Sequence, residues 1–169
     1  MSRDGGRNFY QKQPKEAFPV CDFGYIDTAN KTEVRGEGGK TGIFYLALGD
    51  AGLYKLCYDT KTEEIHVKRL TDTGDACYRM GLGVIGEDRD YLTEEKAIYF
   101  CGRLEGEYGF YRTFDEGKSY ERLNQDNQMY GEINSIDGDK RKFGRFFSGD
   151  RVTRCFVWGD ETSESENII

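Results

Sequence analysis

The sequence predicts an all-β fold built from short strands and tight turns. Twelve Tyr and eleven Phe among 169 residues, against two Pro, favour strands because aromatic side chains suit a pleated surface. Twenty-two Gly supply the positive φ angles that tight turns need. Hydrophobic residues make up 37% of the chain and charged residues 33%, and the length is that of one domain. Composition and length therefore indicate a turn-rich β domain.

Short apolar runs separated by turn signals mark the expected strands. Turn signals lie at 49–50, 72–74, 137–139 and 149–150. Strands of this length at this spacing are typical of all-β architectures. The expected strands are 42–48, 53–58, 65–70, 77–84, 97–102, 109–113, 132–136, 144–148 and 155–158.

One motif, Ser/Thr-x-Asp-x-Gly-x-x-aromatic, occurs twice. Residues 2–9 read SRDGGRNF and residues 113–120 read TFDEGKSY. This pattern, the Asp box, suits a hairpin turn: the Asp carboxylate accepts turn amides, Gly takes the strained conformation, and the aromatic begins the outgoing strand. The residues expected to hold these turns are Ser2, Asp4, Gly6, Phe9, Thr113, Asp115, Gly117 and Tyr120.

A degenerate third copy of the motif defines a repeat. The lead-in GFYR at 109–112 recurs as GLYK at 52–55, and Asp59 follows it at the box position with the glycine lost. Asp4, Asp59 and Asp115 are 55 and 56 residues apart. A period near this length in a β-rich chain predicts a β-propeller.

The period also predicts the domain organisation. About three blades of four-stranded antiparallel sheet fill residues 1–159, and residues 160–169 form an acidic flexible tail. Closed propellers typically have four to eight blades. The ring is therefore predicted to be incomplete, either as a fragment or as a chain that closes its ring with other chains.

The charge balance argues against a nucleic-acid partner. Net charge is −7, and the 24 basic residues are scattered among 31 acidic ones. The longest basic run, 140–142, follows a turn signal and is expected to be a solvated loop. No stretch approaches the length of a membrane span, and residues 1–20 contain no apolar segment of a signal peptide.

The remaining motifs assign no cofactor, metal or catalytic residue. The five Cys form no CxxC pair, and Cys57, Cys101 and Cys155 lie in apolar runs where Cys behaves as a small buried hydrophobe. His66 is the single His, and no GxSxG motif occurs, so no Ser/His/Asp set is assigned. Residues 81–86 read GxGxxG without a following helix, which favours a strand in which neighbouring backbones approach closely.

Carboxylates and aromatic rings remain, and both suit carbohydrate chemistry. Glycoside hydrolysis uses two carboxyl groups, but the acidic residues offer many pairs, and the turn already explains Asp4 and Asp115. Tyr108, Tyr130 and Trp158 could stack on sugar rings, because pyranose faces rich in C–H groups suit aromatic planes.

Four ordered segments in the second half of the chain carry a resemblance to a known family: GFYRTFDEGKSYERLNQD at 109–126, NQMYG at 127–131, IDGDKRKFGRFFSG at 136–149 and FVWGD at 156–160. Through them, residues 81–160 resemble the closing part of glycoside hydrolase family 74, the xyloglucanases and oligoxyloglucan-specific cellobiohydrolases. Asn124 and Gln128 lie in the matching segments and join Tyr108 and Tyr130 as candidate substrate-binding residues. The family has His where this chain has Gln128.

The resemblance implies two seven-bladed propellers around a cleft that cleave the β-1,4-glucan backbone of xyloglucan with inversion. In the family two aspartates act as acid and base, and both lie upstream of the matched region, so neither has a counterpart here. The chain is then the C-terminal part of a secreted enzyme whose partners are plant cell-wall xyloglucan and the remaining blades, from upstream sequence or another chain.

Two alternatives to this reading stay open. One is a non-catalytic Asp-box propeller module that binds glycan or protein and is completed by oligomerisation. The other is a sialidase, which needs an arginine cluster for the substrate carboxylate; the sequence shows only scattered Arg.

Overall fold

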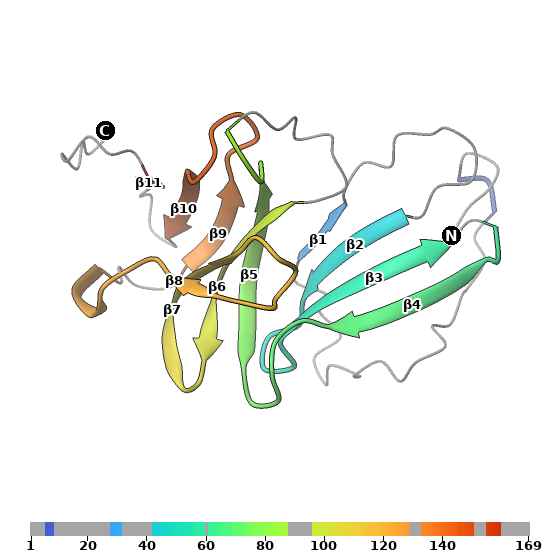
Figure 1. The fold of residues 1–169 in the computed structure, drawn as a ribbon, viewed down its shortest axis with the longest axis horizontal. Helices are drawn as coiled ribbons and strands as arrows, with labels where there is room; N and C mark the ends of the chain where they lie inside the picture. The colour runs from blue at the N-terminus through green and yellow to red at the C-terminus, as the bar shows by residue number, and fades with distance from the viewer. Residues whose placement is uncertain are drawn as a thin grey trace.

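Eleven strands and one short 3-10 helix make up the regular structure in the computed structural model, which describes residues 6–8, 28–31, 42–59, 61–87, 96–128, 133–150 and 155–159. The strands form three antiparallel sheets, named sheets A, B and C. Figure 1 shows sheet A on the right, sheet B in the centre and sheet C on the left. The predicted all-β class with antiparallel sheets is confirmed.

The strands follow one another across each sheet in sequence order. Sheet A consists of β1 (Thr28–Lys31), β2 (Gly42–Ala47), β3 (Leu53–Asp59) and β4 (Glu64–Arg69). Sheet B consists of β5 (Ala76–Gly83), β6 (Ala97–Leu104), β7 (Glu107–Thr113) and β8 (Glu121–Arg122). The helix η1 (Asp126–Gln128) follows, and sheet C consists of β9 (Ile133–Gly138), β10 (Phe146–Asp150) and β11 (Cys155–Trp158).

Each of the predicted runs contains a strand, with small differences at the ends. The elements β1, β8 and η1 were not predicted. The turn expected at 137–139 is wrong at its start, because β9 continues to Gly138, which pairs with Phe146. Sheet C has three strands in the described ranges, where four were expected.

The first strands of sheets B and C approach each other at glycines. A Cβ on Gly81 of β5 would lie 2.6 Å from the carbonyl oxygen of Ile136 and closer still to the Cα of Asp137. A Cβ on Gly83 would lie 2.8 Å from the ring of Tyr99. Real Cβ atoms do not approach other atoms this closely, so these positions require glycine. The predicted close approach of neighbouring backbones is confirmed.

Strand β6 is buried on both faces and separates two cores. Ile98 and Phe100 pack into a core that includes Tyr45 of sheet A. Tyr99 packs into a second core with Phe146 of sheet C. Successive side chains of a strand point to opposite faces, so a strand between two cores reads as a continuous apolar run. This placement explains the apolar run at 97–101 that begins β6.

Sheets A and B are joined by backbone hydrogen bonds and by an ion pair. Gly49, in the turn after β2, exchanges two backbone hydrogen bonds of 2.9 and 2.8 Å with Cys77 of β5. Lys55 of β3 forms an ion pair with Glu116, which lies in the turn between β7 and β8. The two sheets are therefore linked at both the turn after β2 and the turn before β8.

A buried tyrosine lies opposite a basic residue in both sheets. Tyr45 is the register partner of Lys55 in sheet A, and Tyr99 is the partner of Arg112 in sheet B. Burial raises the pKa of both tyrosines, so their hydroxyls stay protonated at neutral pH. The repeat seen in the sequence thus extends to side chains at matching places in two sheets.

The described cysteines differ in how far they are buried. Cys101 is buried, as predicted, and so is Cys77. The expectation of a buried side chain is wrong for Cys155, which is exposed, and holds only in part for Cys57, which is half-buried. Cys155 lies on β11, which in the described residues pairs only with β10, so its alternating side chains face water.

The basic run at 140–142 is only partly the solvated loop that was expected. Lys140 turns back onto the protein, where its Nζ donates to Leu82 O, to Asp137 Oδ1 at 2.5 Å and to Gly138 O at 3.0 Å. Arg141 and Lys142 are exposed. Lys140 therefore connects the end of β5 to the end of β9.

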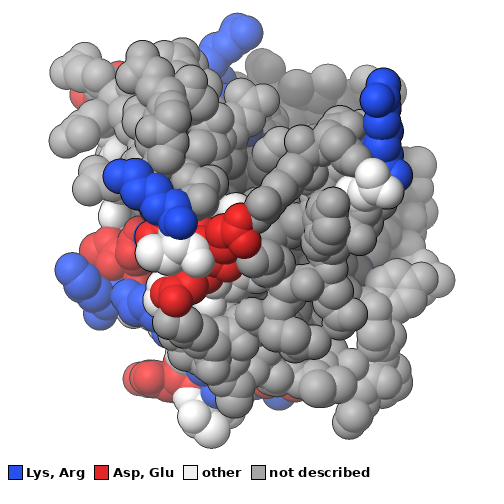
Figure 2. Space-filling view, turned by 90° about the vertical axis from the view of Figure 1, so that its right-hand side faces the viewer, with Lys and Arg blue, Asp and Glu red and all other residues white. Residues whose placement is uncertain are grey.

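The described surface mixes charges of both signs. On the face shown in Figure 2, acidic side chains lie beside lysine and arginine side chains. The part of the chain that the structure describes holds no helix with the length and hydropathy of a membrane span.

Candidate functional site

The turn between β7 and β8 is organised around Asp115. Its Oδ1 accepts the backbone N–H groups of Lys118 and Ser119 at 3.0 and 2.9 Å, and its Oδ2 accepts the Ser119 hydroxyl at 2.6 Å. The Thr113 hydroxyl donates to Asp115 Oδ1 at 2.8 Å and accepts the N–H of Gly117 at 3.0 Å. Every one of these bonds closes the turn, so both oxygens of Asp115 have structural partners.

Backbone and aromatic positions of the same turn complete its geometry. Glu116 and Gly117 have positive φ angles of 58° and 82°. Gly117 lies directly against Leu70. Tyr120 donates its hydroxyl to Leu70 O at 2.8 Å and meets the ring of Phe100 edge-on at 5.8 Å. The turn of sheet B is thereby anchored to the end of β4 in sheet A.

The equivalent turn of sheet A lies between β3 and β4. Asp59 Oδ1 accepts the backbone N–H groups of Lys61 at 2.8 Å and Thr62 at 3.4 Å. Glu63, with φ of 59°, takes the left-handed position there. Of the first motif, Gly6 has φ of 90°, while Ser2, Asp4 and Phe9 lie outside the described residues.

Acid should weaken the turn held by Asp115. Hydrogen bonds from Ser119 lower the pKa of Asp115 from 3.8 to about 2. A lowered pKa in the folded state adds stability above the ordinary pKa, and this stability is lost as pH falls towards about 2. Because the carboxylate is close to solvent, we expect wild type to lose about 1 kcal/mol more than Asp115→Asn between pH 5 and 2.

Urea denaturation of both proteins across this pH range measures that difference. Parallel losses in wild type and Asp115→Asn would show that the carboxylate has no such role.

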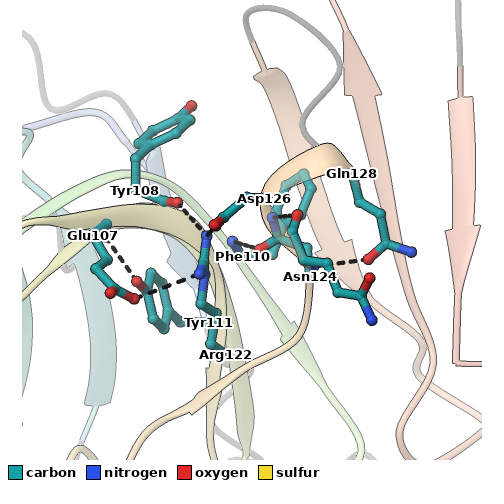
Figure 3. Close-up of polar contacts among 9 residues, drawn as sticks. Glu107, Tyr108, Phe110, Tyr111, Arg122, Asn124, Asp126 and Gln128 are labelled. Carbon is teal, nitrogen blue, oxygen red and sulfur yellow. Dashed lines mark hydrogen bonds and ion pairs between the residues drawn. The ribbon is translucent and has the colours of Figure 1, made fainter.

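Tyr108 is an exposed aromatic residue among the four candidate substrate contacts. It lies on β7 with 38% of its surface exposed, and Figure 3 shows its ring pointing away from the polar cluster around Arg122. Its hydroxyl oxygen accepts the Cys101 thiol at 3.0 Å, and burial raises the pKa of Cys101 to about 11, so this thiol stays protonated. Its ring also lies 6.2 Å from that of Tyr78.

Asn124 has a different position from Tyr108. It is only 5% exposed, and its Oδ1 accepts the backbone N–H of Phe110 at 2.7 Å. Its Nδ2 donates to the carbonyl of Gln125 at 3.0 Å. Asn124 therefore positions the chain after β8 against β7.

The other two candidates lie just beyond Asn124. Gln128 is half-buried, and its Oε1 accepts the backbone N–H of Gln125 at 2.8 Å, which closes the loop of η1 (Figure 3). Tyr130 lies outside the described residues. Trp158, a further possible stacking residue, packs instead against Phe146 and Phe110 with ring centroids at 5.5 and 5.2 Å.

Arg122 organises this region, although no sequence motif pointed to it. Its Nη2 donates to Tyr108 O at 3.2 Å and to Asp126 Oδ1 at 2.6 Å, and its Nη1 lies 3.5 Å from Glu107 Oε2 (Figure 3). Glu107 and Tyr108 lie 15 and 14 residues away along the chain. Only the register of β7 against β8 brings them to Arg122.

Replacing Asn124 with Ala should destabilise the fold. The variant leaves the buried N–H of Phe110 without its acceptor, which costs about 2 kcal/mol of unfolding free energy. Chemical denaturation measures the loss, and Gln125→Ala, at an exposed neighbour, serves as the matched control. An Asn124→Ala variant as stable as wild type would show that this hydrogen bond does not stabilise the fold.

Three of the described carboxylates, Asp59, Asp115 and Asp139, hold turns of the structure. Hydrogen bonds lower the pKa of Asp115 and of Asp59. Burial opposes ionisation of Asp139, yet hydrogen bonds from Arg141 and Arg145 lower its pKa. A general acid in glycoside hydrolysis needs the opposite, a raised pKa. Within the described ranges no group of three or more His, Cys, Asp or Glu could hold a metal ion.

Known proteins similar in sequence are xyloglucanases. A xyloglucanase of Acetivibrio thermocellus is 27% identical over 96% of this chain, and an oligoxyloglucan-reducing end-specific xyloglucanase of Emericella nidulans is 28% identical over 88%. A xyloglucanase of a Paenibacillus species is 31% identical over 66%. The chain spans 19%, 17% and 10% of the lengths of these relatives. No family model matches it.

Two solved structures with a similar fold belong to GH74, the family that the sequence segments resemble. The GH74 enzyme of Niastella koreensis superposes with a TM-score of 0.57 at 21% identity, covering 80% of this chain and 18% of that one. The GH74 xyloglucanase of Xanthomonas campestris gives a TM-score of 0.55 at 21% identity, covering 79% and 17%. The predicted resemblance is confirmed: over most of its length, this chain is similar to a part of the xyloglucanases of glycoside hydrolase family 74.

Proposed function

We propose that this chain is part of a xyloglucan-active glycoside hydrolase. The observation that carries the proposal is a sequence similarity to xyloglucanases that covers 88–96% of the chain. The fold supports it, because 79–80% of the chain superposes on parts of GH74 structures. The reaction is inverting cleavage of the β-1,4-glucan backbone by two aspartates outside this chain.

The contribution of this chain is scaffold and part of the groove wall. Residues 1–159 form the propeller blades and residues 160–169 an acidic tail, at the C-terminal end of the enzyme's propeller region. Tyr108, Gln128 and Tyr130 contact substrate, and the buried Asn124 holds β7 in place. The whole protein acts outside the cell on plant cell-wall xyloglucan, and its other blades complete the ring.

Affinity electrophoresis of the 169-residue chain tests the binding part of this proposal. Gels cast with xyloglucan should retard the chain, and gels with galactomannan should not, because the groove wall is shaped for a β-1,4-glucan backbone. A reducing-end assay on the same sample should show no cleavage. Equal mobility in all gels would show that the chain forms no xyloglucan-binding part of the groove wall. Reducing ends that are still released after purification would place the catalytic residues inside this chain.

A non-catalytic binding module completed by oligomerisation is the second candidate. It is favoured by β11, where Val157 is 45% exposed on a strand that in the described residues pairs only with β10. Unpaired strand edges favour association. Light scattering should then show a defined oligomer of two or more chains, and a monomer or an open-ended aggregate would exclude this module.

A further inference from the structure

We propose that Tyr78 and Tyr108 together form a stacking site for the pyranose ring of a neutral saccharide, with Asp50 as a hydrogen-bonding group at its rim. The inference rests on the proposed function for the class of ligand only. It adds a second ring to Tyr108, one of the stacking candidates that the sequence suggested. This second ring comes from a different strand and has a partner in a different sheet.

The two tyrosines come from strands on either side of β6. Tyr78 lies at an irregularity of β5, where the register shifts between Cys77 and Arg79. Such a bulge re-aims a side chain out of the regular ladder. Its ring centroid is 6.2 Å from that of Tyr108 on β7, and the ring planes are inclined at 49°. At this angle the rings do not cover each other face to face, so they leave aromatic surface for a ligand.

Both rings are held at their hydroxyls by separate partners. Tyr78 donates to Asp50 Oδ1 at 3.0 Å, and Asp50 lies in the turn between β2 and β3 of sheet A. The Tyr108 hydroxyl accepts the thiol of the buried Cys101, while Arg122 holds the Tyr108 carbonyl. A site whose side chains are already fixed loses little conformational entropy on binding. The pair is therefore pre-organised.

The surroundings favour a neutral ligand over an anion. The guanidinium of Arg79, next to Tyr78, already donates to Asn134 O at 3.1 Å and to Tyr78 O at 2.8 Å. At the β6–β7 hairpin the exposed residues include one cation, Arg103, and the anions Glu105 and Glu107, so the local field has no strong positive sign. A pyranose offers C–H-rich faces for the rings and hydroxyls for Asp50.

Saturation-transfer NMR on the 169-residue chain tests the site with two probes, a xyloglucan heptasaccharide and cellotetraose. Irradiation of tyrosine ring protons should transfer to sugar ring protons of at least one probe. Tyr78→Ala and Tyr108→Ala should each weaken binding about tenfold, while Tyr78→Phe and Tyr108→Phe, which keep the ring, should stay within about threefold of wild type. Tyr58→Ala, at a half-buried tyrosine of sheet A, is the matched control and should bind normally.

A measurement on unsubstituted protein keeps the test decisive if an alanine variant does not fold. Nitration by tetranitromethane, mapped by peptide mass spectrometry, should modify Tyr108 in the free chain and be suppressed by the saccharide. Nitration of Tyr108 that neither saccharide affects would overturn the site. So would displacement of the saccharide by a proline-rich peptide that protects both rings more strongly, because the site would then belong to a peptide.

The outcomes separate this inference from the proposed function. If xyloglucan retards Tyr78→Ala and Tyr108→Ala as strongly as wild type, the stacking site is wrong. The proposed xyloglucan-binding role of the chain then stands without Tyr108 as a contact. If cellotetraose binds at the two tyrosines while xyloglucan does not bind at all, the stacking site stands and the proposed function is wrong.

Discussion

Replacing Gly81 with valine is expected to unfold the contact between sheets B and C. The new Cβ would lie 2.6 Å from Ile136 O and would overlap with the Cα of Asp137. Both of these are backbone atoms of β9, so no side-chain rotation relieves the overlap. Forcing β5 and β9 apart should cost about 3 kcal/mol of unfolding free energy. Urea denaturation followed by circular dichroism measures the loss.

Gly42→Ala is the matched control for this substitution. Gly42 is also a strand glycine, and a Cβ there would find its nearest neighbour, the ring of Phe44, at an ordinary 3.4 Å. We expect Gly42→Ala to change the unfolding free energy by less than about 1 kcal/mol, because the flexibility of a glycine does not stabilise a strand. Equal stability losses at the two positions would show that the clash at Gly81 is not what requires glycine.

Truncating Phe146 should have the largest effect of any core substitution in sheet C. Phe146 is 2% exposed, and its ring contacts Tyr99, Phe110 and Trp158 at centroid distances of 5.3, 5.7 and 5.5 Å. Phe146→Ala removes the ring at the centre of this aromatic cluster and should cost about 4 kcal/mol. Thermal unfolding of the variant, with tryptophan fluorescence reporting on Trp158, measures the loss.

The neighbouring Phe147 provides the control within the same strand. It is half-buried, and the guanidinium carbon of Arg145 lies 5.8 Å from its ring centroid. Because alternate residues of a strand face opposite sides, Phe147 lies outside the aromatic cluster. Phe147→Ala should therefore cost less than half as much. If the two alanine variants are equally stable, the cluster does not hold sheet C to sheet B.

Together these substitutions separate two ways in which the sheets are held. Gly81 tests how closely two backbones must approach, and Phe146 tests how much apolar contact fills the space beside them. Tyr108 carries the candidate binding surface on the strand that also bears Phe110, a member of the aromatic cluster. A protein that loses the cluster should therefore also lose saccharide binding, without any change to Tyr108 itself.

Local sequence patterns determined the strands and the main turn. The apolar runs fall on strands because a short run between turn residues has few other ways to satisfy its backbone. The turn at 113–120 could be predicted from sequence because the hydrogen-bond partners of Asp115 lie within four residues of it. The glycines of β5 could be assigned to a close approach because no helix followed them. Similarity to xyloglucanases also came from ordered segments of sequence.

Only the tertiary structure decided which side of the fold each side chain faces. Asn124 seemed a ligand contact but is buried against Phe110, and Trp158 seemed a stacking residue but lies in the aromatic cluster. Arg122 and Tyr78 had no local signal for these roles, because Glu107 and Tyr108 lie 15 and 14 residues from Arg122, and Asp50 lies 28 residues from Tyr78. A strand pattern specifies two alternating faces, but strand register and sheet packing decide which face is buried, and both depend on contacts distant in sequence.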